Sequence, residues 1–105
     1  MNPLRATLLF FALSVGLSCR PGTPHSVTLT WQTPKASEGA SIVGYNIYRW
    51  TSNDSRSVKI AGRISGPPYE DHQVVSGQTY FYAVTAVDQS GRESRLSENT
   101  QAKVP

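Results

Sequence analysis

Apolar and polar positions alternate with a period of two over most of the chain after residue 25, as they do in half-buried β-strands. The clearest short example is the segment SVTLTW, residues 26–31, in which Val27, Leu29 and Trp31 share one face and threonines the other. No segment after residue 19 has apolar residues at helical spacing over about ten positions. The pattern therefore predicts an all-β domain.

Three consecutive aromatic residues, Tyr80, Phe81 and Tyr82, lie within the longest alternating segment, residues 78–87. Successive side chains of a strand point to opposite faces, so the three rings cannot all enter one core. Alternation places Tyr80 and Tyr82 in the interior with Val84, and it leaves Phe81 pointing outward.

A second long alternating segment, residues 42–50, behaves in the same way. Alternation places Tyr45 and Ile47 on its core face, whereas Tyr48 and Trp50 point to the other side. We therefore expect the strand to contribute to the core through one face and to carry two aromatic rings on the other.

The remaining strands are shorter and are separated by turn-forming residues. They are predicted at residues 58–64 and 96–104, with at most a short strand within 69–74 and a loop over 34–40. Gly91 is expected to adopt the positive φ of the hairpin turn after residue 87. Short strands at regular spacing, joined by turns, indicate a β-sandwich.

Three stretches of the chain together resemble the fibronectin type III family, in the form found in bacterial secreted proteins. They are the tryptophan that ends VTLTW, the segment GYNIYR and the segment SGQTYFYAVTAVDQSGRES. The resemblance covers residues 26–105 and implies an immunoglobulin-like β-sandwich with Trp31 packed between the sheets. It also implies a tyrosine corner, in which the buried Tyr80 ring bonds through its hydroxyl to backbone near Val74. Only residues 19–25 would precede this range once a signal peptide at residues 1–18, described below, is removed. The family's first strand is therefore expected to be short or missing.

Residues 1–18 have the features of a secretory signal peptide, which are one basic residue, Arg5, a short apolar core and small residues after it. The apolar core is shorter than the ~20 residues that a membrane-spanning helix needs. The segment GLSC resembles the lipobox of bacterial lipoproteins, which implies lipidation of Cys19, but cleavage without lipidation fits the small residues as well. We expect an extracytoplasmic protein, secreted or lipid-anchored, with residues 19–25 as a short tether.

Composition limits the function classes. The chain has 105 residues, a formal net charge of +3 and one cysteine, which suits a single domain without an internal disulfide. Its basic residues are scattered along the sequence, so we do not expect nucleic-acid binding, which needs them clustered on one element.

The sequence carries no recognisable catalytic motif, such as G-x-S-x-G, H-E-x-x-H or C-x-x-C, so we expect no enzyme activity and no cofactor. Alternation could bring Glu70 and His72 to one face, but two ligands without a third make a weak zinc site, and we expect no metal. Asp71 and Glu93 are interpreted as surface or turn residues.

The candidate binding face consists of Tyr48, Trp50 and Phe81. In the fold that the resemblance implies, their two strands are neighbours, so the three rings share the outward face. Such a set can stack on sugar rings or accept a protein partner, or it can stiffen the exposed sheet by cross-strand pairing.

Two functions therefore remain open. The first is a non-catalytic extracytoplasmic binding or adhesion module for an unidentified protein or polysaccharide. The second is a structural spacer or a fragment of a larger multidomain surface protein or secreted enzyme. We expect a monomer, with membrane contact only through a lipid on Cys19.

Overall fold

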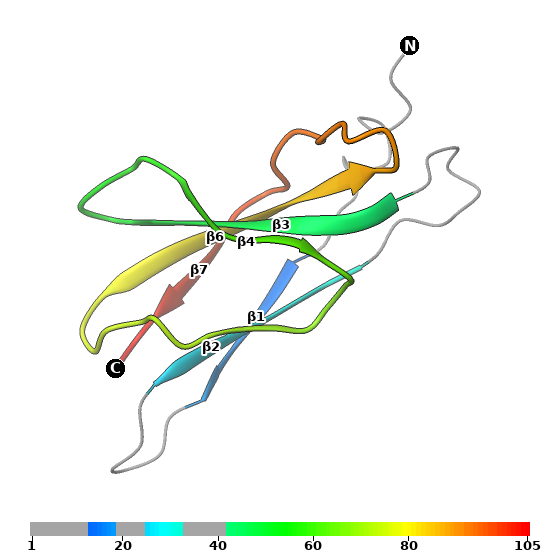
Figure 1. Ribbon diagram of the computed structural model, residues 1–105. Helices are drawn as coiled ribbons and strands as arrows, with labels where there is room; N and C mark the ends of the chain where they lie inside the picture. Colours follow the sequence, from blue (N-terminus) through cyan, green and yellow to red (C-terminus); the bar gives the residue numbers. More distant parts are fainter. Residues whose placement is uncertain (1–12, 19–24, 33–41) are drawn as a thin grey trace.

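The computed structural model describes residues 13–18, 25–32 and 42–105, and this part of the chain consists of strands, turns and extended segments (Figure 1). The strands are β1 (Leu13–Ser18), β2 (Ser26–Trp31), β3 (Ile42–Thr51), β4 (Val58–Ile64), β5 (Tyr69–Asp71), β6 (Thr79–Asp88) and β7 (Thr100–Lys103). Within these described residues, no helix has the length and hydrophobicity needed to cross a bilayer.

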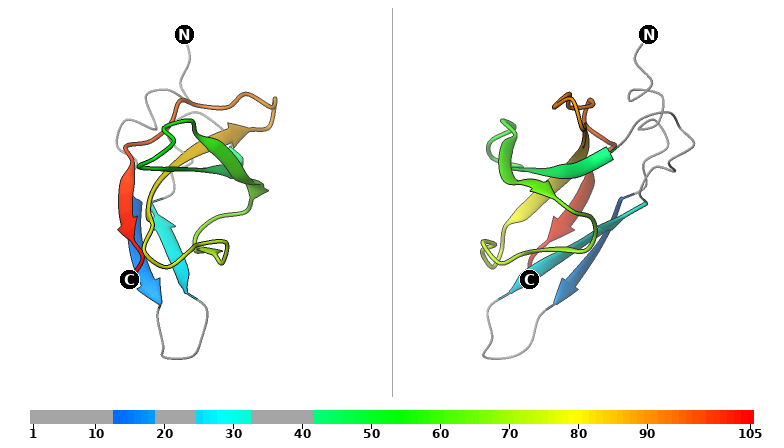
Figure 2. Two further views of the ribbon diagram at one scale, coloured as in Figure 1. Left: turned by 90° about the vertical axis from the view of Figure 1, so that its left-hand side faces the viewer. Right: turned by 45° about the vertical axis from the view of Figure 1, so that its right-hand side comes forward.

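The strands form two antiparallel sheets that pack face to face (Figure 2). One sheet has the order β1-β2-β5 and the other the order β4-β3-β6-β7. This arrangement is the immunoglobulin-like sandwich that the period-two pattern and the family resemblance predicted, because each sheet buries one apolar face against the other.

One correction concerns the first strand, which the resemblance implied to be short or missing. The structure has a first strand of six residues, β1, which pairs with β2 from Leu13 opposite Trp31 to Ser18 opposite Ser26. Its sequence, LSVGLS, alternates apolar residues with serine and glycine, and this period-two pattern overlaps the apolar core of the signal-like segment. The same residues therefore fit both descriptions.

The signal peptide and the lipidation of Cys19 stay predictions. Residues 1–12, 19–24 and 33–41 lie outside the described residues, and Cys19, most of the tether and the predicted loop at 34–40 fall within them.

The last strand is shorter than predicted, four residues at Thr100–Lys103 instead of 96–104. The residues before it still follow the edge of β6, but serine side chains replace part of the ladder. The Oγ atoms of Ser94 and Ser97 accept hydrogen bonds from the Ala86 and Val84 amides at 3.0 and 2.9 Å. This segment therefore protects the edge of β6 without forming a regular strand.

The core lies between the sheets and contains the side chains that alternation assigned to it. Those named from the sequence are Trp31, Tyr45, Ile47, Tyr80, Tyr82 and Val84, and all are buried, together with Val27, Leu29, Ala86, Ala102 and Val104. The Trp31 and Tyr45 rings meet edge to face with centroids 5.5 Å apart, which is a favourable aromatic geometry.

The tyrosine corner is present. The hydroxyl oxygen of Tyr80 accepts a hydrogen bond from the amide of Val75 at 2.9 Å, one residue beyond the position expected. Gly77 in the same turn has a φ of 85°, a conformation that glycine adopts at least cost. The corner ties the turn before β6 to the core.

Candidate functional site

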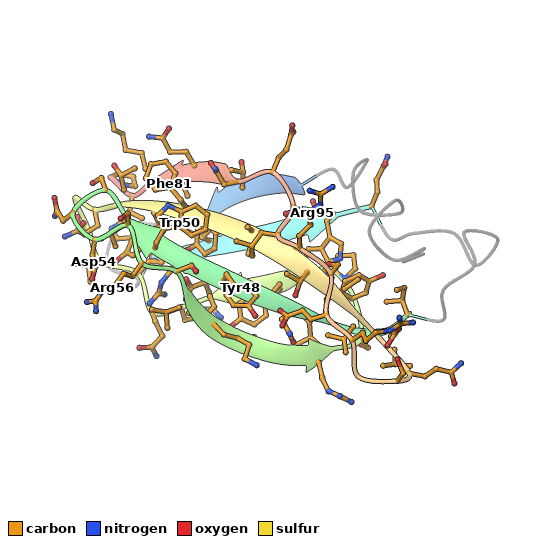
Figure 3. All side chains as sticks on the ribbon, turned by 90° about the horizontal axis from the view of Figure 1, so that it is seen from above. Tyr48, Trp50, Asp54, Arg56, Phe81 and Arg95 are labelled. Carbon is orange, nitrogen blue, oxygen red and sulfur yellow. The ribbon has the colours of Figure 1, made fainter. Side chains whose placement is uncertain are left out.

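The outer face of the four-stranded sheet carries the three aromatic residues that were predicted to form a binding face (Figure 3). Trp50 of β3 and Phe81 of β6 are register partners, and their rings stack with centroids 5.9 Å apart and an interplanar angle of 15°. Tyr48 lies two residues earlier on β3 and points to the same side. All three side chains are half-buried, so each ring has one part packed on the sheet and one part in solvent.

A polar cluster that the sequence did not predict lies beside Tyr48 and centres on Glu93. The Oε2 atom of Glu93 accepts hydrogen bonds from Asn46 Nδ2 at 3.0 Å and from Thr85 Oγ1 at 2.7 Å. It also accepts one from the Tyr48 hydroxyl. Glu93 is an exposed residue, as expected, but it lies beyond the turn in a β-bridge with Val87, which holds its carboxylate over the outer face.

The cluster shifts the pKa values of its two acidic groups, Tyr48 and Glu93, in opposite directions. Burial raises the pKa of the Tyr48 phenol, and the hydrogen bond to Glu93 adds to it, so the pKa reaches about 12. Burial acts to raise the pKa of the Glu93 carboxyl as well, but the hydrogen bonds from Tyr48, Asn46 and Thr85 outweigh it and hold that pKa below its ordinary value. At neutral pH the site therefore contains a neutral phenol and a charged carboxylate.

Three shallow hollows lie in a row along β3, because residues 46, 48 and 50 are alternate positions on the same face. The Trp50 hollow has a volume of about 170 Å³, the Tyr48 hollow about 270 Å³ and the Asn46 hollow about 430 Å³. Each is named here after the β3 residue that lines it, and Glu93 lines both of the larger two. The β3 residues that line neighbouring hollows are two positions apart, a rise of about 6.5 Å along the strand.

Every hollow is also lined by cationic side chains. Arg56 lines the Trp50 hollow and forms an ion pair with Asp54 at 3.0 Å. Arg95 lines the Tyr48 hollow, and Lys59 and Arg63 line the Asn46 hollow. Figure 3 shows Arg56 and Arg95 on the loops that follow β3 and β6. Alternation along β4 could have predicted that Lys59 lies on this face. A strand pattern says nothing about Arg56 and Arg95, because both lie in loops.

Arg63 adopts an uncommon backbone conformation, with a φ of 53°. Its amide donates a hydrogen bond to Asn46 Oδ1 at 2.9 Å, and Gly44 makes room for it, because a Cβ there would lie 3.0 Å from the Arg63 Cα. The neighbouring strand therefore holds this residue in place at the Asn46 hollow.

A second polar cluster lies in the interior and corrects one prediction. Asp71 was interpreted as a surface residue, but it is only 2% exposed. Its Oδ2 atom accepts hydrogen bonds from Arg49 Nη1 and from the Tyr82 hydroxyl, each at 2.7 Å. β5 pairs with β2 in the three-stranded sheet, and Asp71 points from it into the interior. There the side chain of Arg49, from β3 of the other sheet, reaches its carboxylate. Burial, reinforced by Asp71, raises the pKa of Tyr82.

Among the residues that the structure describes, Glu70 and His72 do not join a third candidate metal ligand. Glu70 and His72 are both exposed. The described ranges contain no group of three or more His, Cys, Asp or Glu side chains placed to hold a metal ion.

Comparison with known proteins relates the chain to one family. The sequence profile of the Fibronectin type III domain matches residues 13–103, a range that includes β1. An Amylopullulanase of Thermoanaerobacterium saccharolyticum is 42% identical over 76 residues, which cover 72% of this chain and 6% of that protein. A Poly(3-hydroxybutyrate) depolymerase of Ralstonia pickettii is 33% identical over 87 residues, covering 83% of this chain and 15% of that protein. The chain thus spans a small part of the curated relatives it matches.

A solved structure described as an Fn3-like protein from Clostridium thermocellum superposes on this chain with a TM-score of 0.72. The two are 27% identical, and the match covers 93% of this chain and 95% of that one.

Proposed function

Since this chain belongs to the fibronectin type III family, we propose that it is a non-catalytic extracytoplasmic module that contacts a glycan through the outer face of its four-stranded sheet. The observation that carries the proposal is the stacked pair of Trp50 and Phe81 on the same face as Tyr48, where Trp50 and Tyr48 each line a hollow. Half-exposed aromatic rings offer a flat apolar surface for the apolar faces of sugars, and the polar groups beside them offer hydrogen bonds.

An extracytoplasmic location agrees with two observations. Residues 1–18 have the features of a secretory signal peptide. Relatives named Amylopullulanase, Exoglucanase B and Poly(3-hydroxybutyrate) depolymerase are enzymes that act on polymers. The proposal includes two alternatives, secretion without a lipid and lipidation at Cys19. The mass of the N-terminal peptide of the mature protein distinguishes them.

The test of glycan contact is retention of the purified full chain on insoluble polysaccharides. Replacement of Trp50 and Phe81 by leucine keeps an apolar cover on the sheet but removes the flat rings. We expect this double variant to lose about tenfold in affinity while its melting temperature changes little. Val75→Ala, which truncates an exposed apolar side chain in the turn before β6, serves as the control.

The second candidate function is a spacer between domains of a larger enzyme. It is favoured by the small share of each relative that the chain matches, 6% of one Amylopullulanase and 4% of another. The hydrogen bond from the Tyr48 hydroxyl to Glu93 also favours the spacer function, because this hydroxyl already has a partner within the chain. If no polysaccharide retains the protein and the double leucine variant only melts earlier, the aromatic pair serves the sheet and the spacer function is correct.

A further inference from the structure

We propose that the glycan is an acidic polymer whose sugar carboxylates lie over the Tyr48 and Asn46 hollows. This inference rests on the proposed glycan contact and adds the chemical class of the ligand.

The cations of these two hollows are available for a ligand. Lys59, Arg63 and Arg95 form no ion pair with any residue that the structure describes. In contrast, three other arginines already have acidic partners in the chain. These pairs are Arg49–Asp71, Arg56–Asp54 and Arg92–Asp88, with distances of 2.7, 3.0 and 3.3 Å.

The single carboxylate that lines these two hollows is already engaged. Glu93 borders both, and its Oε2 atom accepts hydrogen bonds from Asn46, Thr85 and Tyr48. Three cations therefore face one carboxylate that has three donors of its own. Lys59 already interacts electrostatically with Glu93 at longer range. The remaining positive charge at this part of the face attracts anions, and a ligand carboxylate would give Arg63 and Arg95 partners that the described residues do not.

The backbone at Arg63 is held in place before any ligand binds. A non-glycine residue with φ of 53° costs energy, and such conformations persist only where the surroundings enforce them. Here the Asn46 side chain and the absence of a Cβ at Gly44 do so. The guanidinium lies near Gly91 across the Asn46 hollow, since Nη2 is 3.7 Å from where a Gly91 Cβ would stand.

The order of the hollows suits an extended chain and not a single sugar. Hollows lined by residues 46, 48 and 50, which rise about 6.5 Å from one to the next along β3, can receive successive rings of a polymer. At the Trp50 hollow the charges of Arg56 and Asp54 neutralise each other, so this end offers the stacked rings to the apolar face of a sugar. The charged hollows follow at Tyr48 and Asn46.

The test measures affinity of the full chain for polygalacturonate and for pullulan, an acidic and a neutral polysaccharide, by affinity electrophoresis. We expect tighter binding to polygalacturonate, with at least about a tenfold loss of affinity between 50 mM and 500 mM salt. The double variant Arg63→Gln/Arg95→Gln should lose about tenfold for polygalacturonate. Arg63→Gly, which accepts the positive φ, replaces Arg63→Gln if the glutamine variant melts early.

Lys103→Gln is the matched control, because it removes one positive charge from β7 and lines none of the three hollows. If it weakens polygalacturonate binding as much as Arg95→Gln alone does, net charge explains the binding and the inference fails. Equal, salt-independent affinity for both polymers also overturns the inference but leaves glycan contact standing. Binding to neither polymer overturns both proposals, and tighter binding to a DNA oligonucleotide than to polygalacturonate overturns the assignment of an acidic glycan.

Discussion

The carboxylate of Asp71 lies 2.7 Å from the guanidinium of Arg49 and connects the two sheets of the sandwich through the interior. The same Oδ2 atom accepts the hydrogen bond of the Tyr82 hydroxyl, and Oδ1 accepts one from the Gln73 amide at 3.0 Å. The Arg49 guanidinium also lies 5.2 Å from the centre of the Tyr80 ring. A buried acid with this many donors is a sensitive point of the fold.

We expect Asp71→Ala to destabilise the domain by about 3 kcal/mol, because it leaves the Arg49 charge and the Tyr82 hydroxyl without their partner. Urea denaturation measures the change in the free energy of unfolding. Glu70→Ala, the exposed acid beside it on β5, is the control and should change stability by less than about 0.5 kcal/mol. Equal effects of the two variants would contradict the bridging role of Asp71.

We expect Trp31→Ala to unfold the domain at ordinary temperature. The side chain is 6% exposed and packs against Tyr45 at the centre of the core. Loss of a buried tryptophan costs about 3–5 kcal/mol, which is comparable to the whole stability of a small domain. Circular dichroism during heating gives the result, and a cooperative transition of the variant above ~45 °C would contradict the assignment of Trp31 to the core.

Tyr80→Phe tests the tyrosine corner, since it removes only the oxygen that accepts from the Val75 amide. We expect a loss of about 1 kcal/mol in the free energy of unfolding. Tyr69→Phe is the matched control, because the Tyr69 hydroxyl makes no hydrogen bond with the residues that the structure describes, and it should be close to neutral. Faster exchange of the Val75 amide hydrogen in Tyr80→Phe would report the same bond directly.

The Glu93 cluster predicts a loss of stability in acid. The pKa of Glu93 is lower in the folded chain than in the unfolded one, so its contribution is present above the unfolded pKa and is lost as the pH falls through the folded pKa. We expect the free energy of unfolding of Glu93→Gln to fall less than that of the wild type between pH 5 and pH 3. Asp88, whose pKa is also lowered by its bonds to Ser90 and Arg92, retains its own pH dependence in both proteins. Parallel pH profiles of the two proteins would exclude the cluster as a stabilising element.

Because β1 lies within residues 1–18, we expect these residues to stabilise the domain. Removal of these residues leaves the edge of β2 unpaired, because β1 covers β2 along its whole length. We expect a protein of residues 19–105 to melt about 5–10 °C below the full chain. The intact mass of the mature protein then shows whether cleavage before Cys19 takes β1 away in the cell. Equal melting temperatures would mean that β1 adds nothing to the sandwich.

Local pattern was sufficient for the core and for most strands, although it missed β1 and made the last strand too long. The bounds of β2 and β4 were predicted to the residue, and the buried face of β6 follows from alternation from Tyr80 to Ala86. Side-chain direction in a strand repeats every two residues, so neighbouring letters of the sequence carry this information. The resemblance to the fibronectin type III family is confirmed by the profile match over residues 13–103.

The polar clusters and the hollows depended on tertiary structure. Asn46 and Glu93 are 47 positions apart in the sequence, and Arg49 and Asp71 are 22 apart. No alternation within one strand can show which side chain of another sheet or loop meets it. Burial of Asp71 required the docking of β5 opposite β3, and the charge of the outer face required the loops after β3 and β6 to fold back beside it. The sequence thus determined which residues form strands and which faces are apolar, whereas the packing of distant segments decided where polar groups are paired and which cations line the hollows of the outer face.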